Sequence, residues 1–155
     1  MEKTLIMLCG CPGSGKSTWT QQYKENKKVV IISRDEIRFR LVSENEEYFS
    51  KENQVFNIFI SEINKALQDT EHNIIIIDAT HISRKSRAKV LNRLNLSNIT
   101  LEAITFHPSL KECLERNKQR EGRARIPDSA IINMYKNYQK PEHIEGFDTI
   151  TRFYY

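Results

Sequence analysis

The chain has 155 residues, of which 39% are hydrophobic and 28% are charged, and it carries a formal net charge of +4. These values are typical of one globular domain with a single core, and they exclude a disordered or collagen-like chain. The longest apolar runs are far shorter than the about 20 residues that a membrane-spanning helix needs. Because no signal-peptide cleavage site follows the first residues, we predict a cytoplasmic protein. Its three cysteines follow no disulfide or zinc-site spacing, so we expect free thiols.

Strand and helix patterns alternate along the chain, with strands predicted from apolar or β-branched runs and helices from apolar residues at helical spacing. In chain order, the first half predicts a strand over 4–9, a helix over 16–25, a strand over 29–33, a helix over 35–42, a loop over 44–50 and a helix over 52–68. The second half predicts a strand over 74–77, a helix over 83–94 capped by Ser83, a strand over 99–106, a helix over 109–119, a helix from 127 to about 138 and a strand over 148–153. This alternation predicts a three-layer α/β fold with a parallel sheet covered on both faces. No linker divides the chain, so residues 1–155 are expected to form one domain.

The turn after the first predicted strand, Gly10-Cys-Pro-Gly-Ser-Gly-Lys-Ser17, matches G-x-x-x-x-G-K-[ST] in full. Its glycines let successive backbone N–H groups point inward and form an anion nest, and the following helix adds its N-terminal dipole. Lys16 can reach the β- and γ-phosphates of a nucleotide, and the Ser17 hydroxyl can bind Mg²⁺. We therefore predict a site for ATP and Mg²⁺, with nucleotide contacts from Gly13, Ser14, Gly15, Lys16, Ser17 and Thr18.

Asp35 follows the second predicted strand directly. In a parallel sheet, the chain that leaves a strand at its carboxyl end arrives where the ligand binds. A carboxylate there can accept the proton of an attacking hydroxyl, which makes Asp35 a candidate general base. A plain helix N-cap is the alternative role. Arg38 lies one helical turn later on the same face, where it can hold an anionic acceptor.

The fourfold isoleucine run at 74–77 ends in Asp78. An apolar strand that ends in an acid is the Walker B pattern, in which the acid orients Mg²⁺ directly or through water. A loop or capping acid is the alternative for Asp78. Thr80 lies at the strand exit, and we interpret His81 as a bystander.

Positive charge is concentrated in residues 84–125, where eleven Lys and Arg stand against four acids. Such a block fits a phosphate-rich partner, and for residues 84–93 a solvated helix face is an equal alternative. Arg116, Arg120 and Arg123 lie in a short stretch, about 116–127, that suits a lid closing over ATP and neutralising the transferred phosphoryl group. The absence of an N-K-x-D element disfavours a GTPase, and the length leaves little room for a remodelling ATPase.

Five segments together resemble the kinase module of the bacteriophage polynucleotide 5′-hydroxyl kinase family. They are Gly10-Cys-Pro-Gly-Ser-Gly-Lys-Ser-Thr-Trp19, Arg34-Asp-Glu-Ile-Arg38, Asp78-Ala-Thr-His81, Arg116-Asn117 with Arg120, and Pro127 with Met134-Tyr-Lys136. They occur in the family's order and cover nearly the whole chain. The sequence departs from the family at Ala79, which separates Asp78 from Thr80, and in a longer lid. The phage enzyme also carries a phosphatase domain beyond the kinase module.

The resemblance implies a P-loop fold like that of adenylate kinase, with a five-stranded parallel sheet, and transfer of the ATP γ-phosphate to the 5′-hydroxyl of DNA or RNA. It implies that Lys16 and Ser17 hold the phosphates and Mg²⁺, that Asp35 is the general base and Arg120 the lid arginine, and that the acceptor binds Arg38, Asp78 and Thr80. Together with the Walker B pattern, this predicts Lys16, Asp35 and Arg120 as catalytic groups and Ser17 and Asp78 as Mg²⁺ ligands. The lid arginines, Arg116, Arg120 and Arg123, are expected to contact the nucleotide.

Two alternatives remain at this point. One is a kinase of a small hydroxylated molecule such as a nucleoside, sugar or antibiotic. The other is a nucleotide-dependent nucleic-acid-binding module with little transfer activity. The basic block favours a polymeric, phosphate-rich acceptor over a neutral small one. Asp35 favours turnover, because a binding module needs no base at that position.

Overall fold

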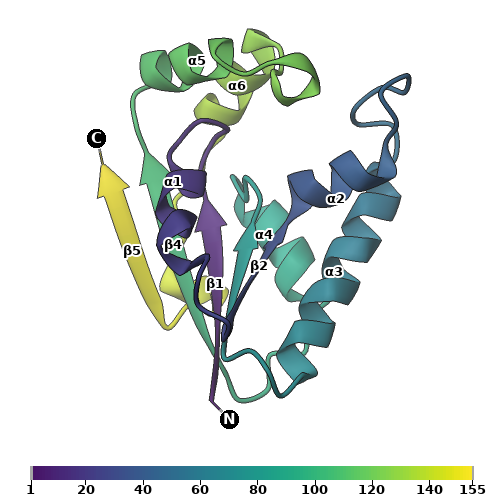
Figure 1. Ribbon diagram of the computed structural model, residues 1–155. Coiled ribbons are helices and arrows are strands. Elements are labelled where there is room, and N and C mark those ends of the chain that lie inside the picture. Colours follow the sequence, from purple (N-terminus) through teal and green to yellow (C-terminus); the bar gives the residue numbers. More distant parts are fainter. Residues whose placement is uncertain (1, 155) are drawn as a thin grey trace.

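The computed structural model describes residues 2–154 and contains one five-stranded parallel sheet in the order β2-β3-β1-β4-β5 (Figure 1). The strands are β1 (Lys3–Cys9), β2 (Val29–Ser33), β3 (Ile74–Asp78), β4 (Ile99–His107) and β5 (Thr149–Tyr154). The predicted α/β fold with a five-stranded parallel sheet is confirmed, and the strand bounds agree with the predicted ones to within one residue.

Six α-helices connect or follow the strands in the described residues, and short 3₁₀ turns complete three of the connections. The helices are α1 (Lys16–Thr20), α2 (Arg34–Leu41), α3 (Glu52–Gln68), α4 (Arg84–Leu91), α5 (Leu110–Lys118) and α6 (Asp128–Lys136), and the turns are η1 (Gln21–Tyr23), η2 (Gly122–Ala124) and η3 (His143–Glu145). Within residues 2–154, no helix has both the length and the apolar character needed to cross a membrane.

The core lies on both faces of the sheet because successive side chains of a strand point in opposite directions. Leu5 and Met7 of β1 pack with the buried faces of α3 and α4. Ile6 and Leu8 point the other way and pack with Trp19 of α1 and other partly buried side chains. A third cluster, which includes Cys11 and Cys113, lies between the phosphate-binding loop and the helices α5 and α6. All three cysteines are buried free thiols, as expected.

The helix predicted over residues 16–25 is shorter in the structure. The α-helix ends at Thr20 and continues as the tighter 3₁₀ turn η1. The Thr20 hydroxyl donates to the Ser17 carbonyl at 2.9 Å, a back-bonding contact that competes with the regular helix ladder. The turn also returns the chain to β2, which begins at Val29.

The carboxyl ends of the strands all point toward one end of the molecule (Figure 1). There α5 and α6 stand above the phosphate-binding loop, while α2 and the chain that joins it to α3 stand on the opposite side (Figure 1). This arrangement brings the loop, α2 and the α5–α6 segment to one place, where the predicted site residues gather.

Candidate active site

The phosphate-binding loop, residues 10–17, joins β1 to α1 and is shaped by its glycines. Gly13 and Gly15 have φ angles of 79° and 108°, a left-handed region that side chains rarely adopt. A β-carbon added at Gly10 would lie 2.6 Å from Ser14 Oγ and 2.9 Å from the Phe106 carbonyl oxygen. The glycines of the motif are therefore required by backbone geometry at Gly13 and Gly15 and by close approach at Gly10.

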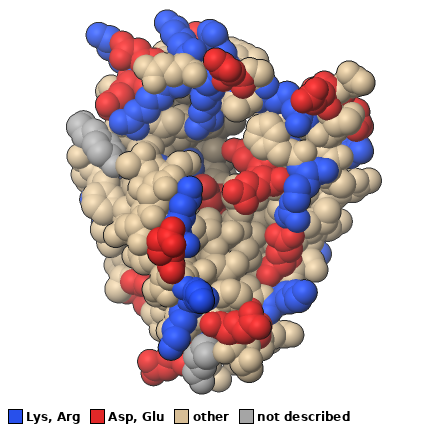
Figure 2. All heavy atoms as spheres, in the orientation of Figure 1, with Lys and Arg blue, Asp and Glu red and all other residues tan. Residues whose placement is uncertain are grey.

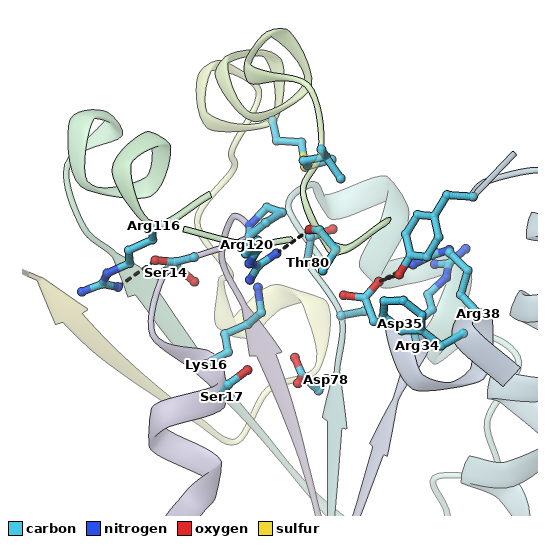
Figure 3. A pocket seen from close by; sticks show the side chains of 18 of the residues that line it. Ser14, Lys16, Ser17, Arg34, Asp35, Arg38, Asp78, Thr80, Arg116 and Arg120 are labelled. Atoms are coloured by element: carbon cyan, nitrogen blue, oxygen red, sulfur yellow. Dashed lines mark hydrogen bonds and ion pairs between the residues drawn. The ribbon is translucent and has the colours of Figure 1, made fainter. Parts of the chain in front are cut away.

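Lys16 lies inside this loop, where its Nζ donates to the carbonyl oxygens of Gly10 at 2.6 Å and Cys11 at 3.2 Å. Burial lowers the pKa of Lys16, and the nearby Asp78 carboxylate opposes that effect. Figure 3 shows the Lys16 amine rising from the loop toward Arg120, with Ser17 beneath it. The loop therefore presents a cation and a hydroxyl on one side of the cavity.

Asp78 ends β3 beside Leu8 of β1 in the register of the sheet. Burial raises the pKa of Asp78, and Lys16 counteracts this rise. The backbone N–H of Gly10 donates to the Thr80 carbonyl at 2.9 Å, which ties the exit of β3 to the phosphate-binding loop. Parallel pairing of β1 with β3 thus places the predicted Walker B acid, Asp78, next to Lys16 and Ser17 in one cavity.

Asp35 lies across the same cavity, in the first turn of α2 (Figure 3). The N-cap of α2 is Ser33, whose hydroxyl accepts from the Glu36 N–H at 3.3 Å, so Asp35 is not the cap. Its carboxylate instead accepts hydrogen bonds from Arg38 and from the Tyr48 hydroxyl, the latter at 3.0 Å. Burial and the Asp35 charge raise the pKa of Tyr48 to about 12, so the phenol is a donor at neutral pH.

Arg38 is buried and held by Glu52, a residue that the sequence analysis did not include in the site. Arg38 Nε donates to one carboxylate oxygen of Glu52 at 2.9 Å and Nη2 donates to the other at 2.6 Å. A bidentate pair of this kind fixes the plane of the guanidinium as well as its position. Glu52 is the first residue of α3, and no local sequence pattern links it to Arg38.

The predicted lid arginines divide into two groups. Arg116 Nη1 donates to the Gly13 carbonyl at 2.7 Å, and Arg120 lines the cavity above Lys16 (Figure 3). The structure does not bring Arg123 to the loop: its guanidinium donates to the Val42 carbonyl and lies 5.0 Å from the centre of the Phe39 ring. The reason is the path of η2, which turns the α5–α6 segment toward α2.

The buried side chain of Asn117 joins the two ends of the chain between α5 and α6. Asn117 Nδ2 donates to the Ile126 carbonyl at 2.7 Å, and its Oδ1 accepts from the Ile126 N–H at 3.2 Å. Because a buried amide with both groups bonded is costly to displace, the two ends of the segment are held together. Eight residues, 118–125, lie between these two anchors.

The basic block of residues 84–125 is not one surface. On α4, Arg84 pairs with Glu142 at 2.6 Å, and the fully buried Arg87 pairs with Glu145 at 2.8 Å. Lys89 lies 4.6 Å from the centre of the Phe56 ring. The α4 cations therefore serve largely structural contacts, whereas Arg116 and Arg120 of the α5–α6 end line the cavity. Figure 2 shows Lys and Arg gathered over that end, above a hollow with acids on its floor.

His81 proves to be a structural anchor of the chain behind Thr80. It has a positive φ of 43° and is almost completely buried. Its Nδ1 lies 2.7 Å from the Leu8 carbonyl oxygen, so the neutral ring donates its proton from Nδ1. The Arg87 guanidinium donates to the His81 carbonyl at 2.9 Å. Burial lowers the pKa of His81 to about 3.

The lowered pKa of His81 predicts a loss of stability in mild acid. Below about pH 6.5 the unfolded chain binds a proton at His81 and the folded chain does not, so the free energy of unfolding falls as pH drops toward 3. His81→Asn keeps the donor, suits the positive φ and cannot titrate. Between pH 7 and 4.5 this variant should lose about 2–3 kcal/mol less than the wild type.

Urea unfolding at the two pH values measures this difference. His143→Asn is the matched control, because that side chain is exposed. The same acid sensitivity in His81→Asn and in the wild type would show that His81 does not contribute to it.

The phosphate-binding loop and the five-stranded parallel sheet together define an α/β P-loop fold. Residues 5–141 match the family model described as an AAA domain, and the chain belongs to that family.

Relatives in sequence cover nearly the whole chain. It is 23% identical over 160 residues to heterogeneous nuclear ribonucleoprotein U-like protein 2 of Homo sapiens, over 97% of this chain and 21% of that protein. It is 26% identical over 159 residues to a protein named as a candidate bifunctional polynucleotide kinase/RNA ligase of Autographa californica nuclear polyhedrosis virus, over 94% and 22% of the two chains. The chain therefore spans about a fifth of the length of these curated relatives.

Solved structures show the same fold at low identity. A chain of the Pnkp1/Rnl/Hen1 RNA repair complex superposes with a TM-score of 0.71 at 21% identity, over 88% of this chain and 44% of that one. A fungal RNA kinase superposes with a TM-score of 0.69 at 15% identity, over 98% of this chain and 76% of that one. For a gluconokinase of Sinorhizobium meliloti the TM-score is 0.61 at 19% identity, over 97% and 82% of the two chains. The resemblance to polynucleotide kinases is confirmed, and sugar-directed kinases share the fold.

Proposed function

We propose that this chain transfers the γ-phosphate of ATP to the 5′-hydroxyl of DNA or RNA. The observation that carries the proposal is one cavity of about 620 Å³ with the phosphate-binding loop on one side and the Asp35–Arg38 pair on the other. A nucleotide held by the loop would direct its terminal phosphate toward a carboxylate base and a cation. This arrangement suits an acceptor that carries a hydroxyl next to a negative charge.

On the nucleotide side, the loop amides and Lys16 would hold the β- and γ-phosphates, with Gly13, Ser14, Gly15, Ser17 and Thr18 in contact. Ser17 and Asp78 fit Mg²⁺, because both offer oxygen ligands to the same cavity and Mg²⁺ usually takes one or two protein ligands beside phosphate and water. In residues 2–154 no group of three or more acids, His or Cys forms a protein cage for a metal, in line with that mode of binding. When bound, Mg²⁺ supplies charge neutralisation on the phosphate oxygens.

The lid arginines complete the nucleotide side in this proposal. Arg116 would clamp the loop through Gly13, its partner in the structure. Arg120 would meet the negative charge that develops on the transferred phosphoryl group, because it lies above Lys16 in the cavity. Such a group contributes most when its contact strengthens in the transition state. Arg123 would instead act on the acceptor side.

On the acceptor side, Asp35 would accept the proton of the attacking hydroxyl. Arg38 Nη1 binds Asp35 in the structure, and Glu52 holds the other two nitrogens. An acceptor phosphate that binds Arg38 would therefore replace Asp35 at Nη1 and leave Asp35 free to take the proton. Asp78 and Thr80, which also line the cavity, would contact the acceptor sugar.

The relatives support this acceptor by their names, which include a polynucleotide kinase/RNA ligase and an RNA kinase. A kinase of a small hydroxylated molecule is the second candidate. The likeness to a gluconokinase favours it, and so does the neutralisation of Arg38 by Glu52 and Asp35. A nucleotide-dependent nucleic-acid-binding module is the third candidate. It needs no general base, so Asp35 would then serve only to hold Arg38 and Tyr48.

The acceptor classes are separated by one set of rate measurements with labelled ATP. A nucleoside, a nucleoside 3′-monophosphate, gluconate and a 5′-OH oligonucleotide serve as acceptors at two salt concentrations. We expect the 3′-phosphate to raise kcat/KM about 10- to 100-fold, the value of a charge-assisted hydrogen bond. For a single-stranded oligonucleotide, affinity should fall with salt at a log–log slope of about −0.7 per phosphate contact.

Arg38→Gln should erase the advantage of the 3′-phosphate and leave the stabilisation by Mg-ATP nearly intact. The matched control is Arg40→Ala, because Arg40 lies on the same helix but pairs with Glu62 on the surface. If the 3′-phosphate brings no gain and salt has no effect on the oligonucleotide, while gluconate or the nucleoside is phosphorylated efficiently, the small-molecule function replaces the polynucleotide one.

A further inference from the structure

Three aromatic side chains form one wall of the cavity, and the chemistry described above uses only the hydroxyl of one of them, Tyr48. Phe39 lies on α2, and Tyr48 and Phe49 lie in the chain that leads to α3. The Phe39 and Tyr48 ring centres are 5.3 Å apart, and those of Tyr48 and Phe49 are 5.0 Å apart. All three line the cavity. Phe39 is 40% and Phe49 is 43% exposed, so large apolar surfaces remain in contact with solvent.

The wall begins at the candidate base. The Tyr48 hydroxyl is 3.0 Å from the Asp35 carboxylate, and both phenylalanine rings lie against the Tyr48 ring. A hydroxyl that reaches Asp35 would therefore bring the rest of its own nucleotide, or the next one, alongside the rings. The wall and the base serve the same end of the acceptor.

Two arginines support the rings. The Arg38 guanidinium lies 5.1 Å from the centre of the Tyr48 ring and 5.0 Å from that of Phe49. Arg123 lies 5.0 Å from the Phe39 ring centre and is anchored on the Val42 carbonyl. Cation–π contacts of this kind hold aromatic side chains in place without covering the remaining ring faces. The exposed phenylalanines are thus preorganised rather than free to fold into the core.

The charge of the surrounding loop narrows the choice of ligand. Glu44, Glu46 and Glu47 precede Tyr48 in the same loop, and the Arg38 charge beside the rings is neutralised by Asp35 and Glu52. The wall therefore carries little net positive charge, and its exposed ring faces offer the main contact to a ligand. Stacking of a base on an aromatic ring is worth about 1–3 kcal/mol and tolerates any base. A sugar acid has no flat apolar face that could make the same contact.

We propose that Phe39, Tyr48 and Phe49 form a stacking wall for the nucleobases at the 5′ end of a single-stranded acceptor. The inference rests on the proposed function and deepens it, because it assigns the bases, in addition to the phosphates, a part in substrate recognition. The wall does not distinguish one base from another. It selects acceptors whose terminal bases are unpaired and free to stack.

The test compares 5′-OH oligonucleotides that are identical except for the first two nucleotides, which carry either bases or abasic tetrahydrofuran residues. With the wild type, kcat/KM should be about 5- to 100-fold higher for the oligonucleotide with bases. Phe49→Ala and Phe39→Ala should move this ratio toward one. Ile144→Ala is the matched control, because Ile144 is an exposed apolar residue, 87% accessible, that does not line the cavity. It should keep the wild-type ratio.

A second measurement needs no transfer. An oligonucleotide with 2-aminopurine at its 5′ end should lose fluorescence on binding the wild type, because the base stacks, and should lose much less with Phe49→Ala. Two results would overturn the inference: equal rates for base-bearing and abasic acceptors with the wild type, and binding of the 2-aminopurine oligonucleotide without quenching. Failure of the proposed function has a different signature, which is phosphorylation of gluconate or a nucleoside in preference to every oligonucleotide.

Discussion

Asp35→Asn is expected to lower kcat about 10²–10⁴-fold, the usual cost of losing a general base. The substitution keeps the size of the side chain and an oxygen that can accept from Tyr48, but it removes the negative charge that would take the hydroxyl proton. Arg38 stays in place because Glu52 still binds two of its nitrogens. ATP binding should be nearly unchanged, because Asp35 lies across the cavity from the loop.

Steady-state rates with a 5′-OH oligonucleotide and thermal melting with and without Mg-ATP measure the two effects separately. Glu36→Gln is the matched control: it removes a carboxylate from the next position of the same helical turn, where the side chain is exposed. A near-normal kcat in Asp35→Asn would assign Asp35 to holding Arg38 and would remove it from the chemical step.

Lys16→Ala is expected to reduce transfer by at least about 10²–10³-fold, the loss that follows removal of one preorganised donor to the reacting group. It should also abolish most of the stabilisation that Mg-ATP gives to the folded chain. The reason is that Lys16 serves the loop and not the core: its partners in the structure are two carbonyl oxygens of the loop itself. Without nucleotide, the melting temperature should stay close to that of the wild type.

Thermal melting across a series of Mg-ATP concentrations gives the binding effect, and single-turnover transfer gives the rate. Lys24→Ala is the matched control, because it removes an exposed lysine just beyond the same helix. A Lys16→Ala protein that ATP stabilises as strongly as the wild type would contradict the assignment of the loop to ATP.

Local patterns in the sequence were sufficient to predict the fold. Each strand is an apolar or β-branched run, and its alternation with helices favours a sheet of parallel strands joined by crossover helices. The loop at residues 10–17 could also be recognised, because its glycines and Lys16 act through backbone geometry within eight residues of chain. Asp78 followed from the strand that it ends. In these cases, the pattern that identifies a residue lies within one short stretch of sequence.

Tertiary structure decided which side chains form the proposed acceptor side of the cavity. Glu52 binds Arg38 across 14 residues, and Arg123 reaches Val42 across 81 residues, so neither pair leaves a trace in local spacing. The basic block appeared continuous in the sequence, but its α4 part is used in pairs with Glu142 and Glu145. The loop before α3 contributes Tyr48 and Phe49 to the cavity only because α2 and α3 pack side by side. The sequence by itself therefore determined the fold and the phosphate-binding loop motif. Packing between distant segments decided which side chains line the cavity opposite that loop, because contacts between such segments depend on the whole fold.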